Sequence, residues 1–230
     1  MNQTKITVKI FEPLLKGFDH QIDRLFIKRD AFLNHIIKAE VAHLAEEMAG
    51  KRLSSKARQY VSQQLKKMGT KTVNVVVDKD TANALNAVVG QCNMVRDAFL
   101  NRLIIFLRSS APLLSHLELP HFIVRSEFDS VYEEMPTSPL GSMEAVTADP
   151  FYYLRISVAE RYNTGLYLLD LPKKLIGFSC FIDDSQVPGT REYAESMMRS
   201  DELLKELGSF ELDAFAVAPS TVENNAMPCK

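Results

Sequence analysis

Residues 29–34 read RDAFLN, and residues 96–101 read RDAFLN again. The two copies stand at an offset of 67, and the same offset, carried back towards the N-terminus without a gap, aligns the apolar residues that precede them. Ile6, Val8 and Ile10 align with Val73, Val75 and Val77, and Phe18 and Ile22 align with Leu85 and Val89. Self-similarity at a fixed offset indicates a duplicated structural unit, so the first half of the chain is predicted to contain two copies of one unit.

Each copy opens with an alternating segment. From Thr4 to Ile10 the apolar residues occupy every second position, and Lys5, Thr7 and Lys9 occupy the positions between them. A period of two is typical of a strand with one buried face. The second copy repeats this pattern around Val75, with Thr72, Asn74 and Val76 on the other face. One strand is therefore predicted at the start of each copy.

Two helical segments follow each strand. The first has Pro13 in its first turn, where a missing N–H costs nothing, and its apolar residues follow at helical spacing. A short break at about residues 26–29 separates it from a second helix, which begins near the RDAFLN sequence. The counterparts in the second copy run through Leu85 and Cys92, and then through Phe99 and Phe106. Each copy is thus predicted to be a strand followed by two helices, with Cys92 packed in the core.

A basic connector, residues 49–70, joins the copies. It holds Lys51, Arg52, Lys56, Arg58, Lys66 and Lys67, and its apolar residues recur at helical spacing after Ser54 or Ser55. A basic amphipathic helix is predicted here, and Lys51, Arg52, Lys56 and Arg58 are possible contacts to a nucleic-acid backbone.

A lone strand with one apolar face leaves its backbone N–H and C=O groups unpaired. Pairing the two strands antiparallel solves this problem, with the helices covering the Ile/Val face. The opposite face would then display Lys5, Thr7, Lys9, Thr72, Asn74 and Val76 towards solvent.

This pattern resembles the ribbon-helix-helix DNA-binding proteins of the Arc, MetJ and CopG type. The resemblance covers residues 4–48 and 71–114 and includes the segment from Ile27 to Leu33 that opens the second helix. It implies that one chain forms a pseudo-dimer whose two-stranded ribbon enters the major groove of double-stranded DNA.

The resemblance also implies roles for individual residues. Base reading would fall to the outward positions Lys5, Thr7, Lys9, Thr72, Asn74 and Val76, although Val76 departs from the polar pattern and would at most touch a thymine methyl group. Phosphate contacts would fall to Lys28, Arg29 and Arg96 near the start of each second helix. Asp30 and Asp97 weaken this second assignment, because a carboxylate there repels phosphate.

The distribution of charge along the chain also favours DNA binding by the first half. Residues 1–110 contain 18 Lys and Arg against 10 Asp and Glu, a net charge of +8, and residues 111–230 have a net charge of −10. The basic half suits a polyanion. We expect a sequence-specific DNA-binding regulator, such as a transcriptional repressor. The alternatives are a DNA-bound accessory factor of a plasmid relaxosome or partition system, and an interaction or inhibitor module that binds no DNA.

Other functional classes lack their motifs. The chain has no Gly-rich phosphate loop, no GxSxG and no HExxH, so an enzyme is not expected. His116, Glu118 and His121 match no standard spacing of metal ligands, and neither a metal nor a cofactor is expected. Three widely spaced cysteines and the absence of a signal sequence or long apolar run indicate a cytoplasmic protein without a membrane segment.

The acidic half is predicted to be a small α+β domain over residues 115–218, after a DNA-binding domain over residues 1–114. It could sense an effector, recruit a partner or form a homodimer. A tail over residues 219–230 is expected to be disordered. The expected elements are strands at Phe122–Arg125, Tyr152–Val158, Leu166–Leu171 and Ile176–Ile182, a short helix at Glu127–Met135, and a helix at Arg191–Leu207.

Overall fold

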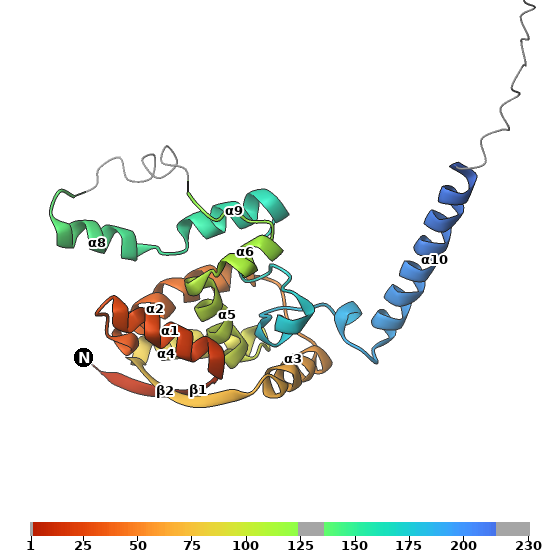
Figure 1. Cartoon of the computed structure of the whole chain (residues 1–230). Coiled ribbons are helices and arrows are strands. Elements are labelled where there is room, and N and C mark those ends of the chain that lie inside the picture. Colours follow the sequence, from red (N-terminus) through yellow and green to blue (C-terminus); the bar gives the residue numbers. More distant parts are fainter. Residues whose placement is uncertain (1, 124–135, 215–230) are drawn as a thin grey trace, which may run out of the picture. The chain divides into compact units, whose positions relative to one another are not determined.

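The computed structural model describes residues 2–123 and 136–214 of the chain. The chain divides into two compact units, Met1–Asp183 and Asp184–Lys230. Its described residues are mainly helical, with one two-stranded antiparallel sheet (Figure 1). The first unit therefore extends past residue 114, where the sequence pattern suggests a domain boundary.

The predicted order of strand, helix and helix occurs twice. The first copy consists of β1 (Gln3–Phe11), α1 (Glu12–Arg24) and α2 (Arg29–Glu47). The second consists of β2 (Thr70–Asp78), α4 (Lys79–Gln91) and α5 (Arg96–Arg108). Between them lies α3 (Ser55–Lys67), whose N-cap Ser54 accepts a hydrogen bond from the Ala57 amide, as the connector pattern predicts.

The strands pair antiparallel with a register that reflects the repeat. Thr7 lies opposite Asn74, which is also its equivalent at the offset of 67. A pseudo-twofold axis therefore passes between these two residues. The two ends of the ribbon close in the same way, because the Glu12 amide donates to the Gly69 carbonyl and the Lys79 amide donates to the Asn2 carbonyl. The predicted pairing of the two strands is confirmed.

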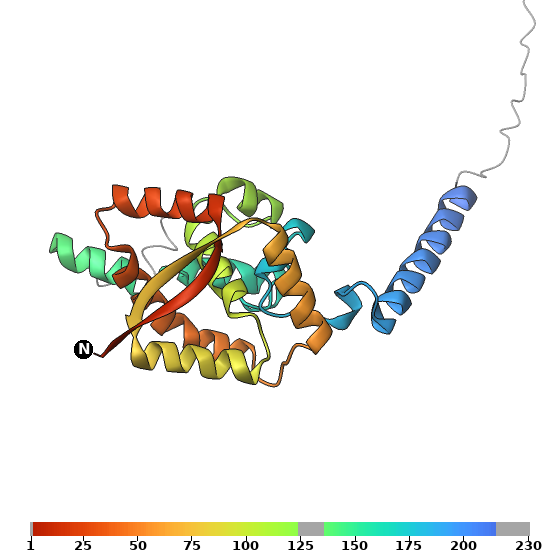
Figure 2. The same cartoon turned by 90° about the horizontal axis from the view of Figure 1, so that it is seen from below.

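The core joins the two copies. The inner face of the ribbon is buried, with Val8, Ile10 and Val75 fully inaccessible to solvent. Helix α2 packs on β2 and α4, and α5 packs on β1 and α1, so each second helix contacts the strand and the first helix of the other copy. Figure 2 shows the helices on one side of the ribbon and its outer face turned to the viewer. Neither copy can form this core alone.

Three strands predicted beyond residue 150 are wrong. Tyr152–Tyr162 is a helix, α9, residues 166–171 form no strand, and residues 173–178 form a 3-10 helix, η1. An alternating run of seven residues fits a helical period nearly as well as a period of two, and an apolar run can mark any buried segment. The predicted helix at 127–135 and the tail at 219–230 lie outside the described residues, as does part of the strand predicted at 122–125.

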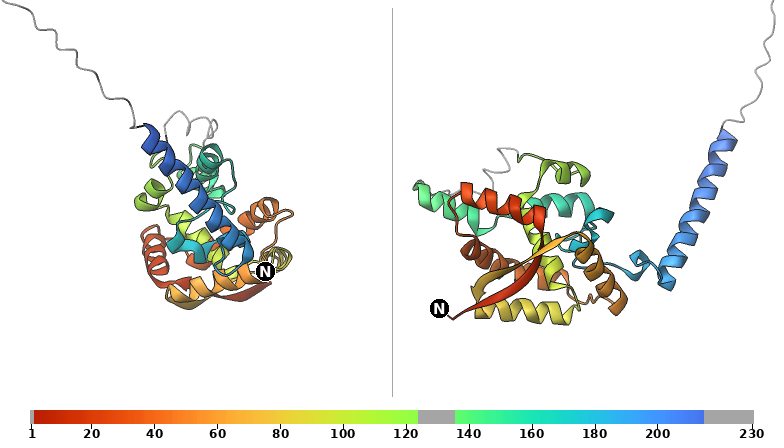
Figure 3. Two further views of the ribbon diagram at one scale, coloured as in Figure 1. Left: turned by 90° about the vertical axis from the view of Figure 1, so that its right-hand side faces the viewer. Right: turned by 60° about the horizontal axis from the view of Figure 1, so that its bottom comes forward.

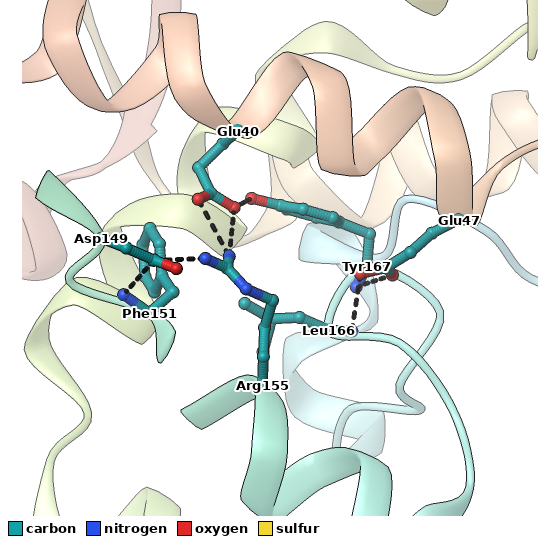
Figure 4. A network of polar contacts seen from close by, with 7 residues as sticks. All are labelled: Glu40, Glu47, Asp149, Phe151, Arg155, Leu166 and Tyr167. Carbon is teal, nitrogen blue, oxygen red and sulfur yellow. Dashed lines mark hydrogen bonds and ion pairs between the residues drawn. The ribbon is translucent and has the colours of Figure 1, made fainter. Parts of the chain in front are cut away.

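These segments are apolar because they cover α5. Arg102, fully buried in the middle of α5, donates hydrogen bonds to the carbonyl groups of Leu166 and Leu169. The Glu47 carboxylate on α2 accepts bonds from the Leu166 and Tyr167 amides (Figure 4). Burial raises the pKa of Glu47, and the amide bonds oppose that rise. Side chains of α2 and α5 thus replace the ladder of a sheet for this backbone.

Two further short helices complete the described part of the first unit: α6 (Ala111–His116) and α8 (Pro139–Ala148). The second unit contains a 3-10 turn, η2 (Asp184–Gln186), and α10 (Arg191–Ala214), which begins at the predicted residue and runs further than predicted. The Thr190 hydroxyl accepts a hydrogen bond from the Tyr193 amide and caps α10. Among the described helices we find none that is both long and apolar enough to cross a bilayer.

Candidate nucleic-acid interface

The outer face of the ribbon displays the predicted side chains. Lys5, Thr7 and Lys9 of β1 and Thr72 and Asn74 of β2 are exposed, and Val76 is half-buried. They form three cross-strand pairs: Lys5 with Val76, Thr7 with Asn74, and Lys9 with Thr72. The views in Figure 3 show the ribbon at the surface of the first unit, with no described helix of that unit over its outer face.

The central pair is connected by a hydrogen bond. The Thr7 hydroxyl donates to the Asn74 side-chain oxygen over 2.9 Å. This bond orients the amide, so that its NH2 group and the second lone pair of its oxygen remain for a ligand. The middle of the ribbon therefore presents a donor and an acceptor in a defined orientation.

The RDAFLN sequence closes the two free edges of the ribbon. Arg96 donates to the Thr7 carbonyl over 2.5 Å, and the equivalent Arg29 donates to the Asn74 carbonyl over 3.4 Å. Thr7 and Asn74 are themselves equivalent, so the two bonds obey the pseudo-twofold axis. Both arginines, predicted as phosphate contacts, thus bind to ribbon backbone.

The aspartates of the repeat also bind the ribbon backbone at equivalent positions. The Asp30 carboxylate accepts the Val76 amide over 3.2 Å, and the equivalent Asp97 carboxylate accepts the Lys9 amide. Desolvation raises the pKa of Asp97, and its partners Arg96 and Lys9 oppose the rise. The acids that weaken the phosphate assignment thus have a structural role, as acceptors for strand amides.

Asn34 and Asn101 complete the closure. The Asn34 side chain accepts the Asp78 amide over 2.8 Å, and Asn101 accepts the Phe11 amide over 2.8 Å and donates to the Lys9 carbonyl over 2.8 Å. Exposed strand edges pair readily with other chains, and side chains that occupy them prevent this. The sequence carries a signal for this role, because identical polar residues recur at equivalent positions of the two helices.

We expect Asn101→Ala to destabilise the first unit by about 1–3 kcal/mol, since it leaves partly buried backbone groups of β1 without their side-chain partner. Urea unfolding of the two proteins measures the difference. Asn86→Ala, at an exposed position of α4, is the matched control. Equal midpoints for the two variants would contradict the closure of the edge by Asn101.

The other predicted phosphate contacts differ in their surroundings. Lys28 is exposed at the N-cap of α2. In the connector, Lys56 is exposed, Arg52 donates to the Gln91 carbonyl over 3.1 Å, and Arg58 donates to the Asn93 side chain over 3.1 Å. Lys51 lies 5.5 Å from the centre of the Phe181 ring. Lys28 and Lys56 are therefore the contacts of this set with the greatest freedom to reach a ligand.

Cys92, Cys180 and His121 lie in structural surroundings. Cys92 and Cys180 are buried free thiols, and burial raises the pKa of Cys180 to about 12. His121 shares a hydrogen bond with Ser115, and Glu118 forms an ion pair with Arg161. Within residues 2–123 and 136–214 there is no group of three or more His, Cys, Asp or Glu placed to hold a metal ion.

Comparisons with known proteins give no match for this chain, whether with family models, with curated proteins or with solved structures.

Proposed function

We propose that the chain is a ribbon-helix-helix protein that binds double-stranded DNA sequence-specifically and inserts the β1–β2 ribbon into the major groove. The observation that carries the proposal is the outer face of the ribbon, where six predicted base-reading residues lie in cross-strand register without covering from the helices of the first unit.

The dimensions of the ribbon suit the groove. Two strands lie about 5 Å apart, and a major groove about 12 Å wide accommodates such a ribbon with its side chains. The side chains have suitable chemistry: lysine donates to guanine O6 and N7, asparagine pairs with adenine N6 and N7, and threonine bonds to a base or touches a thymine methyl group. The Thr7–Asn74 bond holds the central amide ready for such a pair.

The two halves of the ribbon read different sequences. Lys5, Thr7 and Lys9 lie across the pseudo-twofold axis from Thr72, Asn74 and Val76, and the two sets differ at every position. One chain supplies both strands, so a monomer is the minimal binding unit. Its site is short and imperfectly symmetric, and the Val76 half has the weaker preference.

Regulation of transcription is the role that we favour, because binding at a promoter needs only a tight and specific site. A DNA-bound accessory factor of a mobile element would use the same ribbon. The position of the site separates these roles: overlap with the promoter of its own operon favours a repressor, and a place beside a nick or a replication origin favours the accessory factor.

Selection of bound duplexes from a random pool, repeated at several salt concentrations, tests the proposal. We expect enrichment of one short, imperfectly symmetric site, with affinity that falls steeply as salt rises because bound phosphates release counterions. If no duplex is enriched even at low salt, the ribbon is not a DNA reader and an interaction module becomes the better interpretation.

A further inference from the structure

Helix α3 has a composition unlike that of the other helices. It carries Lys56, Arg58, Lys66 and Lys67 and has no acidic residue. Its apolar side, made of Ala57, Val61 and Leu65, is buried. Five Ser and Gln residues and exposed cations occupy most of the rest, so the solvent-facing side of α3 consists of hydrogen-bond donors without a competing carboxylate.

Part of this side lines a hollow of about 390 Å³. Arg58, Gln59, Gln63 and Lys66 contribute from α3, and Asn93 contributes from the turn between α4 and α5. The bond from Arg58 to Asn93 connects the two walls. The same turn leads directly to Arg96 at the start of α5, whose Nε atom is buried and has no hydrogen-bond partner.

The equivalent turn of the first copy has the opposite character. The hollow beside it is lined by Asp19, Asp23 and Asp30 together with Lys28 and Arg29. The offset of 67 places Asn86 and Gly90 at the positions equivalent to Asp19 and Asp23. Two of the three acids beside the first turn are thus replaced by neutral residues in the second copy, where Asp97 is the equivalent of Asp30, and the cations of α3 lie near the second turn.

Helix α3 lies next to one end of the ribbon. Helix α3 runs into β2 through Met68 and Gly69, and Gly69 adopts a φ of 77° that makes the turn. In Figures 1 and 2, α3 lies beside the end of the ribbon where Phe11 faces Thr70, at the level of the strands and not behind the helices. A duplex held against the ribbon would pass close to this helix.

We infer that the donor side of α3 binds DNA backbone phosphates at the Phe11–Thr70 end of the ribbon, so that the protein holds its duplex asymmetrically. This inference rests on the proposed function. Lys66 and Arg58 supply positive charge, and Gln59 and Gln63 supply neutral donors to the phosphate oxygens. The contacts fix the orientation of the pseudo-symmetric ribbon on its site. Without them, the orientation would depend only on the different outward side chains of β1 and β2.

The test compares Gln59→Ala/Gln63→Ala/Lys66→Ala with the wild-type chain. Lys38→Ala, which removes one exposed charge from α2, is the control. Binding to the duplex recovered by selection is measured against salt, and hydroxyl-radical footprints are recorded on both strands. We expect the slope of log K against log[salt] to fall in magnitude by about 0.9 for the one lost cation, and protection to shorten on one flank alone.

A second variant tests the acidic side. Asp19→Asn/Asp23→Asn removes two charges that oppose phosphate, so we expect tighter binding and a footprint extended on the flank that α3 does not contact. Unchanged slope and footprint in the α3 variant would overturn the inference and leave the ribbon proposal intact. Absence of duplex binding by the wild-type chain would instead defeat the proposed function and the inference together.

Discussion

Replacing Lys5, Thr7 and Lys9 together by Ala is expected to abolish sequence-specific DNA binding. Each well-formed base contact contributes about 1–3 kcal/mol of discrimination, so the loss of three contacts lowers specific affinity by at least roughly 100-fold. The loss of two lysines also removes positive charge and so weakens binding to any duplex. Competition binding with the selected duplex and a scrambled duplex measures both effects, because the scrambled duplex reports the electrostatic part alone.

The variant should fold normally, since all three side chains are exposed on the outer face of the ribbon. Lys16→Ala/Lys38→Ala removes the same charge from exposed positions on α1 and α2 and is the matched control. Thr72→Ala/Asn74→Ala adds a positional readout, because it should relax preference at the centre of the site and at the end where Lys9 lies opposite Thr72, and leave the Lys5 end unchanged. If the triple variant retained its preference for the selected duplex over the scrambled one, the ribbon would not be the reading element.

The pairing of the two strands could be predicted because three independent patterns agree. The alternation from Thr4 to Ile10 identifies a strand, the RDAFLN repeat fixes its equivalent at Val73–Val77, and an unpaired edge requires a partner. The observed pairing of Thr7 with its own equivalent, Asn74, is what a twofold arrangement of the two copies demands. The helices follow from their apolar spacing, which the duplication shows twice.

The closure of the ribbon edges could not be predicted with the same ease. Periodicity describes where side chains point, and it does not tell which backbone group a polar side chain will meet. The sequence predicts a phosphate contact for Arg29, and it does not predict that the guanidinium also reaches the Asn74 carbonyl. Identity of polar residues at equivalent positions was the available clue, because a shared surface charge needs no such identity and a shared hydrogen bond does.

The strands predicted after residue 150 are wrong for a related reason. Its apolar runs suggest strands, and a strand needs another strand to satisfy its backbone. Here side chains of the duplicated helices satisfy the backbone instead of a second strand. Arg102 donates to the carbonyl groups of Leu166 and Leu169, and Glu47 accepts bonds from two amides. The sequence around a charged residue in a helix does not show which distant segment it will bind.

Glu40→Ala is expected to destabilise the entire first unit by about 3–5 kcal/mol. The Glu40 carboxylate is buried on α2, where it accepts two bonds of 2.9 Å from Arg155 on α9 and one of 2.5 Å from the Tyr167 hydroxyl (Figure 4). Its removal leaves the buried Tyr167 hydroxyl without its partner and leaves the half-buried Arg155 guanidinium with Asp149 as its remaining carboxylate partner. Thermal unfolding followed by circular dichroism should show a melting temperature lower by roughly 10 °C.

Glu46→Ala, an exposed position on the same helix, is the control and should change little. Glu40→Met/Arg155→Met/Tyr167→Phe replaces Glu40 and the two side chains that bond to it with apolar groups and should recover most of the lost stability, because the cost lies in the unpaired groups and not in the absence of charge. Both variants should unfold in one transition for the first unit, since Glu40 joins the duplicated helices to the segment after residue 150. Separate transitions, with the duplicated half unaffected by Glu40→Ala, would show instead that the two segments fold independently.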